Sequence, residues 1–126
     1  VESLTQQDER IKVYTSDFFP EADFQNYLNA ADICVFPFAE VLTSGSAITA
    51  LSFGCPAILP RLGCLPELID ETMGVLYDVK AHDGLGDALV SARGLDLQIA
   101  RKACYLRAES LNWYDIAADL ASVYRA

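Results

Sequence analysis

Short apolar runs alternate with amphipathic segments along most of this chain, and this alternation constrains the fold more than any other feature. Runs that are apolar throughout are typical of strands buried on both faces, as in parallel sheets covered by helices. We expect four such strands, near residues 11–14, 33–37, 56–59 and 74–77. Because the segments between them have helical spacing, each connection should be a right-handed parallel crossover. The sequence therefore predicts an α/β fold, a parallel sheet with helices on both faces.

The helices should fall between these strands and over the last third of the chain. Apolar residues recur at helical spacing over residues 24–31, and a second helix is expected over residues 44–53. Gly54 should end that helix, because glycine accepts the left-handed conformation found at helix ends. Further helices are expected to begin at Asp83 and Asn112, which are both good N-caps.

The composition restricts the function classes. A chain of 126 residues fits one domain, taken here as residues 1–126. It carries 18 acidic and 9 basic residues, a net charge of −9, which argues against a surface for nucleic acid. No apolar run approaches the length of a membrane span, and the polar start is unlike a signal peptide. Because the sequence does not begin with Met, we expect a piece of a longer protein.

The four cysteines are predicted to be reduced. Cys34 and Cys55 lie in apolar runs, so both should be buried and behave as small hydrophobes. Cys64 and Cys104 form no C-x-x-C motif with any other cysteine, and the single His82 lies far from all four in sequence. We therefore expect no metal site and no disulfide, and free thiols favour a cytoplasmic protein.

The most informative junction between a strand and a helix is the one that ends in Thr43, Ser44, Gly45 and Ser46. In open α/β sheets, ligands bind where strands end and loops enter helices. The amides of Gly45, Ser46 and Ala47 should point out of the helix start, where the helix dipole favours a phosphate. The alternative is that this run only caps a helix. It matches neither the P-loop nor the dinucleotide-binding motif.

A second junction follows the strand at 56–59. Arg61 is a cation at a strand end, where it either contacts an anion or lies in solvent. Gly63 allows a tight turn, and Glu67 falls in the next helix, where a structural role is favoured over a catalytic one. Cys64 has no His beside it in sequence and is not expected to be a nucleophile. Glu40, in the first loop, either binds sugar hydroxyls or is simply exposed.

Five motifs in a fixed order carry a family resemblance. They are AADICVFP at 30–37, FGCPAI at 53–58, G-x-x-PELI at 63–69, GVLY at 74–77, and NWY at 112–114 with VY at 123–124. Their order and spacing, over residues 11–126, resemble the C-terminal domain of GT-B glycosyltransferases, above all the group-one or family-four branch of retaining sugar transferases. The resemblance implies a Rossmann-like domain that binds the diphosphate of a nucleotide-sugar donor. It also implies sugar transfer with retained stereochemistry, without an obligatory metal or other cofactor.

The resemblance also marks departures from the family pattern. The family has two Glu residues separated by seven residues, and the matching positions here are Val41 and Thr49, with Glu40 one residue from the first. Thr49 thus replaces the usual carboxylate for the donor ribose. The run from Thr43 to Ser46 replaces a glycine-rich segment and should keep its role at the diphosphate.

Family domains also begin with about two more strand–helix units, which supply an Arg and a Lys for the leaving diphosphate. We therefore expect the chain to be the later part of a donor domain, inactive alone. Its partners would be a nucleotide sugar and an acceptor domain of the same full-length protein, and that missing domain could mediate peripheral membrane association. An open sheet edge would favour self-association. The alternatives are a non-catalytic nucleotide-binding or scaffold module and a nucleotide-sugar epimerase.

Overall fold

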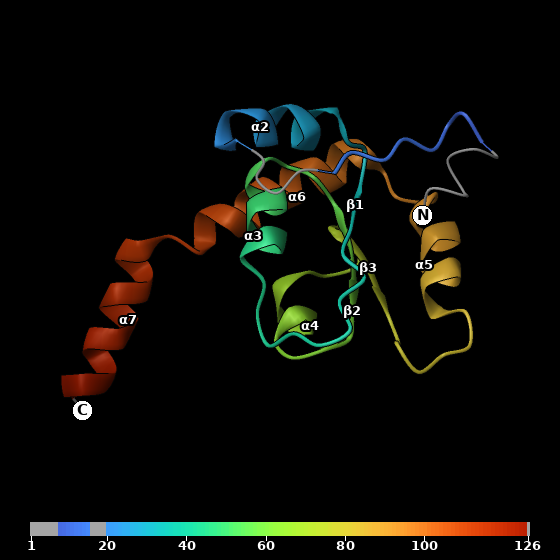
Figure 1. Cartoon of the computed structure of the whole chain (residues 1–126). Helices are drawn as coiled ribbons and strands as arrows, with labels where there is room; N and C mark the ends of the chain where they lie inside the picture. Colours follow the sequence, from blue (N-terminus) through green and yellow to red (C-terminus); the bar gives the residue numbers. More distant parts are fainter. Residues whose placement is uncertain (1–7, 16–19, 126) are drawn as a thin grey trace.

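The computed structural model describes residues 8–15 and 20–125, and within them a three-stranded parallel sheet forms the centre (Figure 1). Its strands are β1 (Cys34–Val35), β2 (Ala57–Pro60) and β3 (Gly74–Tyr77), in the order β1-β2-β3. In the register, Ala57 of β2 lies opposite Cys34 on one side and Gly74 on the other. The predicted parallel sheet is confirmed. Phe36 extends the pairing beyond β1 by donating its N–H to the Ile58 carbonyl (3.1 Å).

The strand expected at residues 11–14 is not formed. Residues 11–15 have no regular secondary structure, and the side chains of Ile11, Val13 and Tyr14 are exposed. A strand is stable only when its backbone groups pair with a neighbouring strand. No described strand runs beside this segment, so its apolar character alone does not make it a strand.

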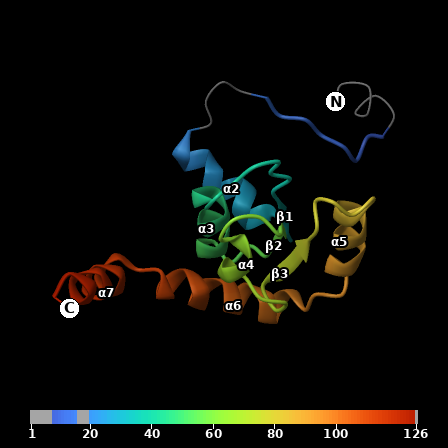
Figure 2. The same cartoon turned by 90° about the horizontal axis from the view of Figure 1, so that it is seen from below.

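Helices cover both faces of the sheet, as predicted. They are α2 (Glu21–Ala30), α3 (Gly45–Ser52), α4 (Leu65–Leu68), α5 (Gly84–Ala92), α6 (Leu97–Ser110) and α7 (Trp113–Arg125). Figure 2 shows α5 on one side of the sheet and α3 and α4 on the other.

Alternation along β2 separates the two sides of the core. Ala57 and Leu59 pack into a cluster with residues of α3, α4 and α6, whereas Ile58 packs with Tyr77 and with Ala88 of α5. Successive side chains of a strand point to opposite faces, so a strand buried on both faces is apolar at every position. All four β2 residues are buried.

Most of the predicted helix ends are confirmed. Gly54 has a φ of 66° and follows α3. The Asn112 side chain accepts a hydrogen bond from the Asp115 amide (3.0 Å), as an N-cap does. Asp83 does precede α5, but its carboxylate makes no capping hydrogen bond with the helix and lies beside Gly86 instead. The side-chain cap predicted there is therefore wrong.

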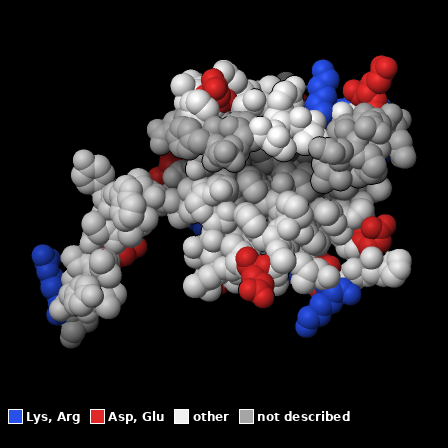
Figure 3. All heavy atoms as spheres, in the orientation of Figure 1, with Lys and Arg blue, Asp and Glu red and all other residues white. Residues whose placement is uncertain are grey.

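The last helix extends away from the body of the molecule (Figure 1). None of the α7 residues is buried, and the side chains of Trp113 and Tyr124 are 82% and 83% exposed. Across the described ranges, no helix combines the length and the apolar character that spanning a membrane requires. In Figure 3, Asp and Glu side chains are scattered over the visible face, and the few Lys and Arg side chains do not gather into a patch.

All four cysteines are free, as predicted. Cys55 and Cys104 are buried, and Cys64 is exposed. Cys34 is only partly buried, which corrects the expectation that it is fully enclosed. It belongs to β1, the edge strand, where one flank has no neighbouring strand among those described.

Candidate functional site

The start of α3 is built by a buried serine. Ser44 has extended backbone dihedrals, and its Oγ accepts a hydrogen bond from the Ala47 amide (3.1 Å). The Ser44 side chain is 7% exposed, so its position is held by packing as well as by the bond. The predicted cap is therefore present, and the helix begins at a fixed point of the loop that follows β1.

Two amides at this helix start remain unengaged. Ala47 is buried and its N–H is occupied by Ser44, which corrects the expectation that it is available to a phosphate. Gly45 and Ser46 are exposed, and their amides make no hydrogen bond within the described chain. The first turn of α3 carries no acidic residue that would repel an anion. The helix dipole adds about half a positive charge at this end.

The space in front of Gly45 is open. A Cβ added to Gly45 would meet nothing within 4 Å. Ser46 lines a cavity of about 540 Å³ together with Lys12, which places a cation on the same side as the exposed hydroxyl. Thr43 and Ser44 line a second, smaller cavity of about 190 Å³. Ligand groups of the size of a phosphate therefore have room beside the two free amides.

Two further residues predicted for the site, Thr49 and Glu40, make no contact that points their side chains at the open space beside Gly45. The Thr49 hydroxyl donates to the Gly45 carbonyl (2.9 Å), so it is engaged with the helix backbone. Glu40 is exposed in the preceding loop, and it makes no hydrogen bond or ion pair within the described chain. Its carboxylate is thus free to approach a ligand hydroxyl.

The second junction lies directly against the first. The amide of Cys64 donates to the Leu42 carbonyl (2.8 Å). Gly63 adopts a φ of 50°, and a Cβ there would lie 2.3 Å from the Leu42 oxygen and 2.6 Å from the Val41 oxygen. The tight turn predicted at Gly63 is confirmed, and the close approach of two backbones explains why glycine occupies it.

Replacing Gly63 by alanine should destabilise the contact between the two loops. The added methyl would meet backbone oxygens that cannot move independently, and the left-handed conformation adds about 1 kcal/mol of strain. We expect the free energy of unfolding to fall by about 2 kcal/mol or more, in the range of overpacked cores. Urea denaturation measures this, with Gly94→Ala as the control, because a Cβ at Gly94 meets only the Ser91 oxygen at 3.4 Å. Equal losses of unfolding free energy in Gly63→Ala and Gly94→Ala would contradict the close backbone contact at Gly63.

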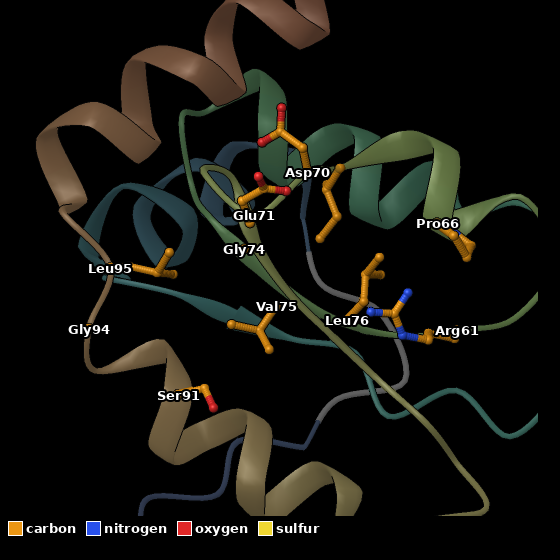
Figure 4. Close-up of a pocket in the computed structure, with 11 residues that line it drawn as sticks. Arg61, Pro66, Asp70, Glu71, Gly74, Val75, Leu76, Ser91, Gly94 and Leu95 are labelled. Atoms are coloured by element: carbon orange, nitrogen blue, oxygen red, sulfur yellow. The ribbon is translucent and has the colours of Figure 1, made fainter.

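Arg61 is placed away from the start of α3. Its backbone amide donates to the Tyr77 carbonyl (2.8 Å), and its side chain lines a cavity of about 590 Å³ along β3. Figure 4 shows Asp70 and Glu71 toward the other end of this cavity. The Thr72 hydroxyl, through its hydrogen bond, lowers the pKa of Asp70, which keeps that carboxylate charged. Two carboxylates and one cation line this cavity of about 590 Å³, so its charge does not favour a diphosphate.

Arg107, which the sequence did not indicate as a site residue, lines the cavity of about 190 Å³ and holds the end of α4. Arg107 of α6 donates from Nε to the Leu68 carbonyl (3.0 Å) and from Nη2 to the Glu67 carbonyl (2.8 Å). These are the last carbonyls of α4, which have no partner within so short a helix. Glu67 itself is exposed, and its described hydrogen bonds run through its backbone. This supports the structural role predicted for it.

Replacing Arg107 by alanine should loosen α4. Two hydrogen bonds from a charged donor to α4 would be lost, together with a longer one to the Ser110 hydroxyl (3.4 Å), and each contributes about 1.5–3 kcal/mol at most. We expect the free energy of unfolding to fall by about 2 kcal/mol, because water reaches the freed carbonyls. Arg107→Lys should restore part of this loss, since one amine can reach only one of the carbonyls at a time. This role would be refuted if Arg107→Lys lowered the free energy of unfolding as much as Arg107→Ala does, or if Arg107→Ala left it unchanged.

Among the residues that the structure describes, no nucleophile and base come together at this site. Cys64 is exposed and lines the smaller cavity, and His82 is exposed in the turn before α5. Over residues 8–15 and 20–125, no group of three or more His, Cys, Asp or Glu side chains is placed to hold a metal ion. What the arrangement offers is two backbone donors, a buried capping hydroxyl and open space, a set suited to binding an anion.

Comparison with solved structures finds 35 matching chains, among them a sucrose-phosphate synthase. The sucrose-phosphate synthase of Thermosynechococcus elongatus is 26% identical to this chain, with a TM-score of 0.75. The match covers 98% of this chain and 32% of the synthase, so the chain spans about a third of the length of that protein. None of the curated proteins matches the chain.

The family comparison covers most of the chain and includes both loops of the site. The sequence model described as glycosyl transferases group 1 matches residues 2–93, a range that includes β1, β2, β3 and the start of α3. The protein therefore belongs to the group 1 glycosyl transferases.

Proposed function

We propose that this chain binds the nucleotide-sugar donor of a glycosyltransferase and holds the donor diphosphate at the start of α3. The observation that carries the proposal is the pair of unengaged amides at Gly45 and Ser46, beside open space and at the positive end of a helix. Membership of a glycosyl transferase family supplies the reaction class. A chain with a net charge of −9 needs such fixed donors to hold an anion.

In this proposal the reaction breaks the bond between the sugar and the diphosphate and transfers the sugar to an acceptor hydroxyl. The two amides and the helix dipole would stabilise the negative charge that develops on the departing diphosphate. The Ser46 hydroxyl can add a further hydrogen bond, and Glu40 is free to approach the sugar. No metal or other cofactor is required for these steps. The sugar would keep its anomeric configuration.

The proposal also needs a cation near the departing diphosphate, and two basic residues are candidates for it. Arg61 is a cation at a strand end, but it lines the cavity along β3. Lys12 lines the same cavity as Ser46, so within the described chain it is the better placed of the two. The proposal assigns the acceptor site, and any further cation, to other parts of the full-length protein. It also assigns the protein to the cytoplasm.

A panel of UDP-, GDP- and ADP-sugars tests the proposal on the full-length protein. A ligand that binds only the folded state raises its stability, by about 2.7 kcal/mol at a hundred times the dissociation constant. We expect one nucleotide class to raise the melting temperature and its sugar to be transferred to an acceptor. Stabilisation without transfer would favour the non-catalytic nucleotide-binding module, for which the absence of Glu at Val41 and Thr49 argues. No stabilisation by any nucleotide would refute donor binding.

A further inference from the structure

Two thiols from distant parts of the sequence touch beside the core. The Sγ atoms of Cys34, in β1, and Cys55, between α3 and β2, lie 3.3 Å apart. The backbone fixes the pair, because the Cys34 amide donates to the Pro56 carbonyl (2.8 Å) and the Cys55 amide donates to the Ala50 carbonyl (2.9 Å). The strand and the loop that carry the two sulfurs therefore hold them close together.

The two thiols differ in access. Cys55 is completely buried in a cluster with Leu28 and Ala50, and its Sγ lies 3.8 and 3.7 Å from the carbonyl oxygens of Ala31 and Pro56. Cys34 is partly exposed and lines the cavity of about 540 Å³ that also contains Ser46. A small reagent can thus reach Cys34 through this cavity but can reach Cys55 only through Cys34.

The hydrogen bond between the thiols makes them chemically unequal. The Cys55 thiol, as the donor, lowers the pKa of Cys34, and the same contact together with burial raises the pKa of Cys55. An accessible thiol of lowered pKa beside a second thiol is the arrangement found in redox-sensitive cysteines. The other two cysteines lack it. Cys64 is exposed, and burial raises the pKa of Cys104 to about 11.

We propose that Cys34 and Cys55 form an oxidisable thiol pair, in which Cys34 reacts with hydrogen peroxide and Cys55 resolves the product to a disulfide. The Cys34 thiolate attacks one peroxide oxygen, the O–O bond breaks, and with one proton from solvent the products are Cys34 sulfenic acid and water. The Cys55 sulfur then attacks the Cys34 sulfur, and its proton leaves with the sulfenic hydroxyl as a second water. Two thiols are oxidised to one disulfide and one peroxide is reduced to two waters.

The disulfide would close a loop that contains the candidate site. A disulfide holds its sulfurs about 2.05 Å apart, so the pair must approach by a little over 1 Å. The segment between the two cysteines includes Gly45 and Ser46, and the cross-link would tie both its ends to the sheet. Oxidation should therefore raise the urea midpoint of this domain, and a thiol reductant should reverse the rise.

The test is hydrogen peroxide oxidation of the full-length protein, followed by thiol blocking, digestion and mass spectrometry. We expect a linked peptide pair containing Cys34 and Cys55, with the loss of two hydrogens, and its disappearance after dithiothreitol. Cys55→Ser should stop the reaction at Cys34 sulfenic acid, which dimedone captures. Cys34→Ser should leave Cys55 unreacted, because its sulfur is enclosed. The matched controls, Cys64→Ser and Cys104→Ser, should form the linked pair as the wild type does.

Three results would overturn the proposal. One is a wild-type protein, folded by circular dichroism, that gives no linked pair. Another is dimedone capture at Cys64 in preference to Cys34 in the Cys55→Ser protein. The third is a linked pair that appears only after urea has unfolded the chain. Two of these three results are read from the wild-type protein, so the proposal can be refuted even if the serine variants do not fold. None of these outcomes depends on donor binding.

Discussion

Gly45→Val should lower the affinity for a nucleoside diphosphate about tenfold or more, which corresponds to the loss of roughly 1.4 kcal/mol of binding energy. The valine side chain would occupy the open space in front of the two free amides. A hydrogen bond to a charged acceptor is worth about 1.5–3 kcal/mol, so displacing the phosphate from even one amide accounts for this loss. The fold should tolerate the change, because a Cβ at Gly45 meets nothing within 4 Å and its φ is not positive.

Calorimetric titration of the full-length protein measures this affinity, and Gly94→Val is the matched control. Gly94 lines the cavity along β3 that contains Arg61, so the two variants make the same substitution at two different candidate sites. We expect Gly94→Val to bind as the wild type does. A loss of affinity in Gly94→Val but not in Gly45→Val would move the diphosphate to the Arg61 cavity.

Gly74→Ala should cause a large loss of stability, about 3 kcal/mol or more, at the upper end of the cost of overpacking. Gly74 begins β3 opposite Ala57, and a Cβ there would lie 1.9 Å from the Ala57 oxygen and 2.9 Å from its carbonyl carbon. Ala57 belongs to the central strand, which pairs on both sides and cannot shift without breaking one of its ladders.

Urea denaturation followed by circular dichroism measures the effect of Gly74→Ala. Gly94→Ala is again the control, because its added Cβ makes only an ordinary contact. The midpoint of Gly74→Ala should fall well below that of the control. An unchanged midpoint would mean that β2 and β3 can separate without loss, which the register described above does not allow.

Features set by local sequence could be predicted. The start of α3 follows from Ser44 and Gly45, because capping depends on residues within one turn of each other. The three strands that do form could be predicted as well, since continuous burial leaves a continuous apolar run. The end of α3 at Gly54 is equally local, because it depends on one backbone conformation.

Features set by distant partners could not be predicted. Residues 11–15 have the apolar character of a strand, but no described strand pairs with them. The role of Arg107 depends on α6 lying beside the end of α4, and nothing in the residues around Arg107 indicates this. Arg61 was placed correctly at a strand end, but the sequence could not show which side of the sheet edge its side chain occupies.

The occupied amide of Ala47 illustrates a different limit. Ser44, which suggests an anion-binding helix start in the sequence, also accepts a hydrogen bond from one of the amides of that start, so capping and anion binding would compete for the amides of the first turn. The sequence indicates both a cap and an anion site, but it does not show which amide serves which. In the structure the Ala47 amide belongs to the cap, and the Gly45 and Ser46 amides make no hydrogen bond within the described chain.

The most direct test of diphosphate binding at α3 is the amide spectrum of the protein labelled with ¹⁵N-glycine and ¹⁵N-serine during titration with a nucleoside diphosphate. Glycines report on both candidate cavities, since Gly45 opens α3 whereas Gly74 and Gly94 line the cavity with Arg61. The Gly45 and Ser46 amides, assigned from Gly45→Ala and Ser46→Ala, should move downfield and saturate together, while those of Gly74 and Gly94 stay in place. Saturating shifts at Gly74 and Gly94, with Gly45 and Ser46 unmoved, would contradict the assignment of the diphosphate to this helix.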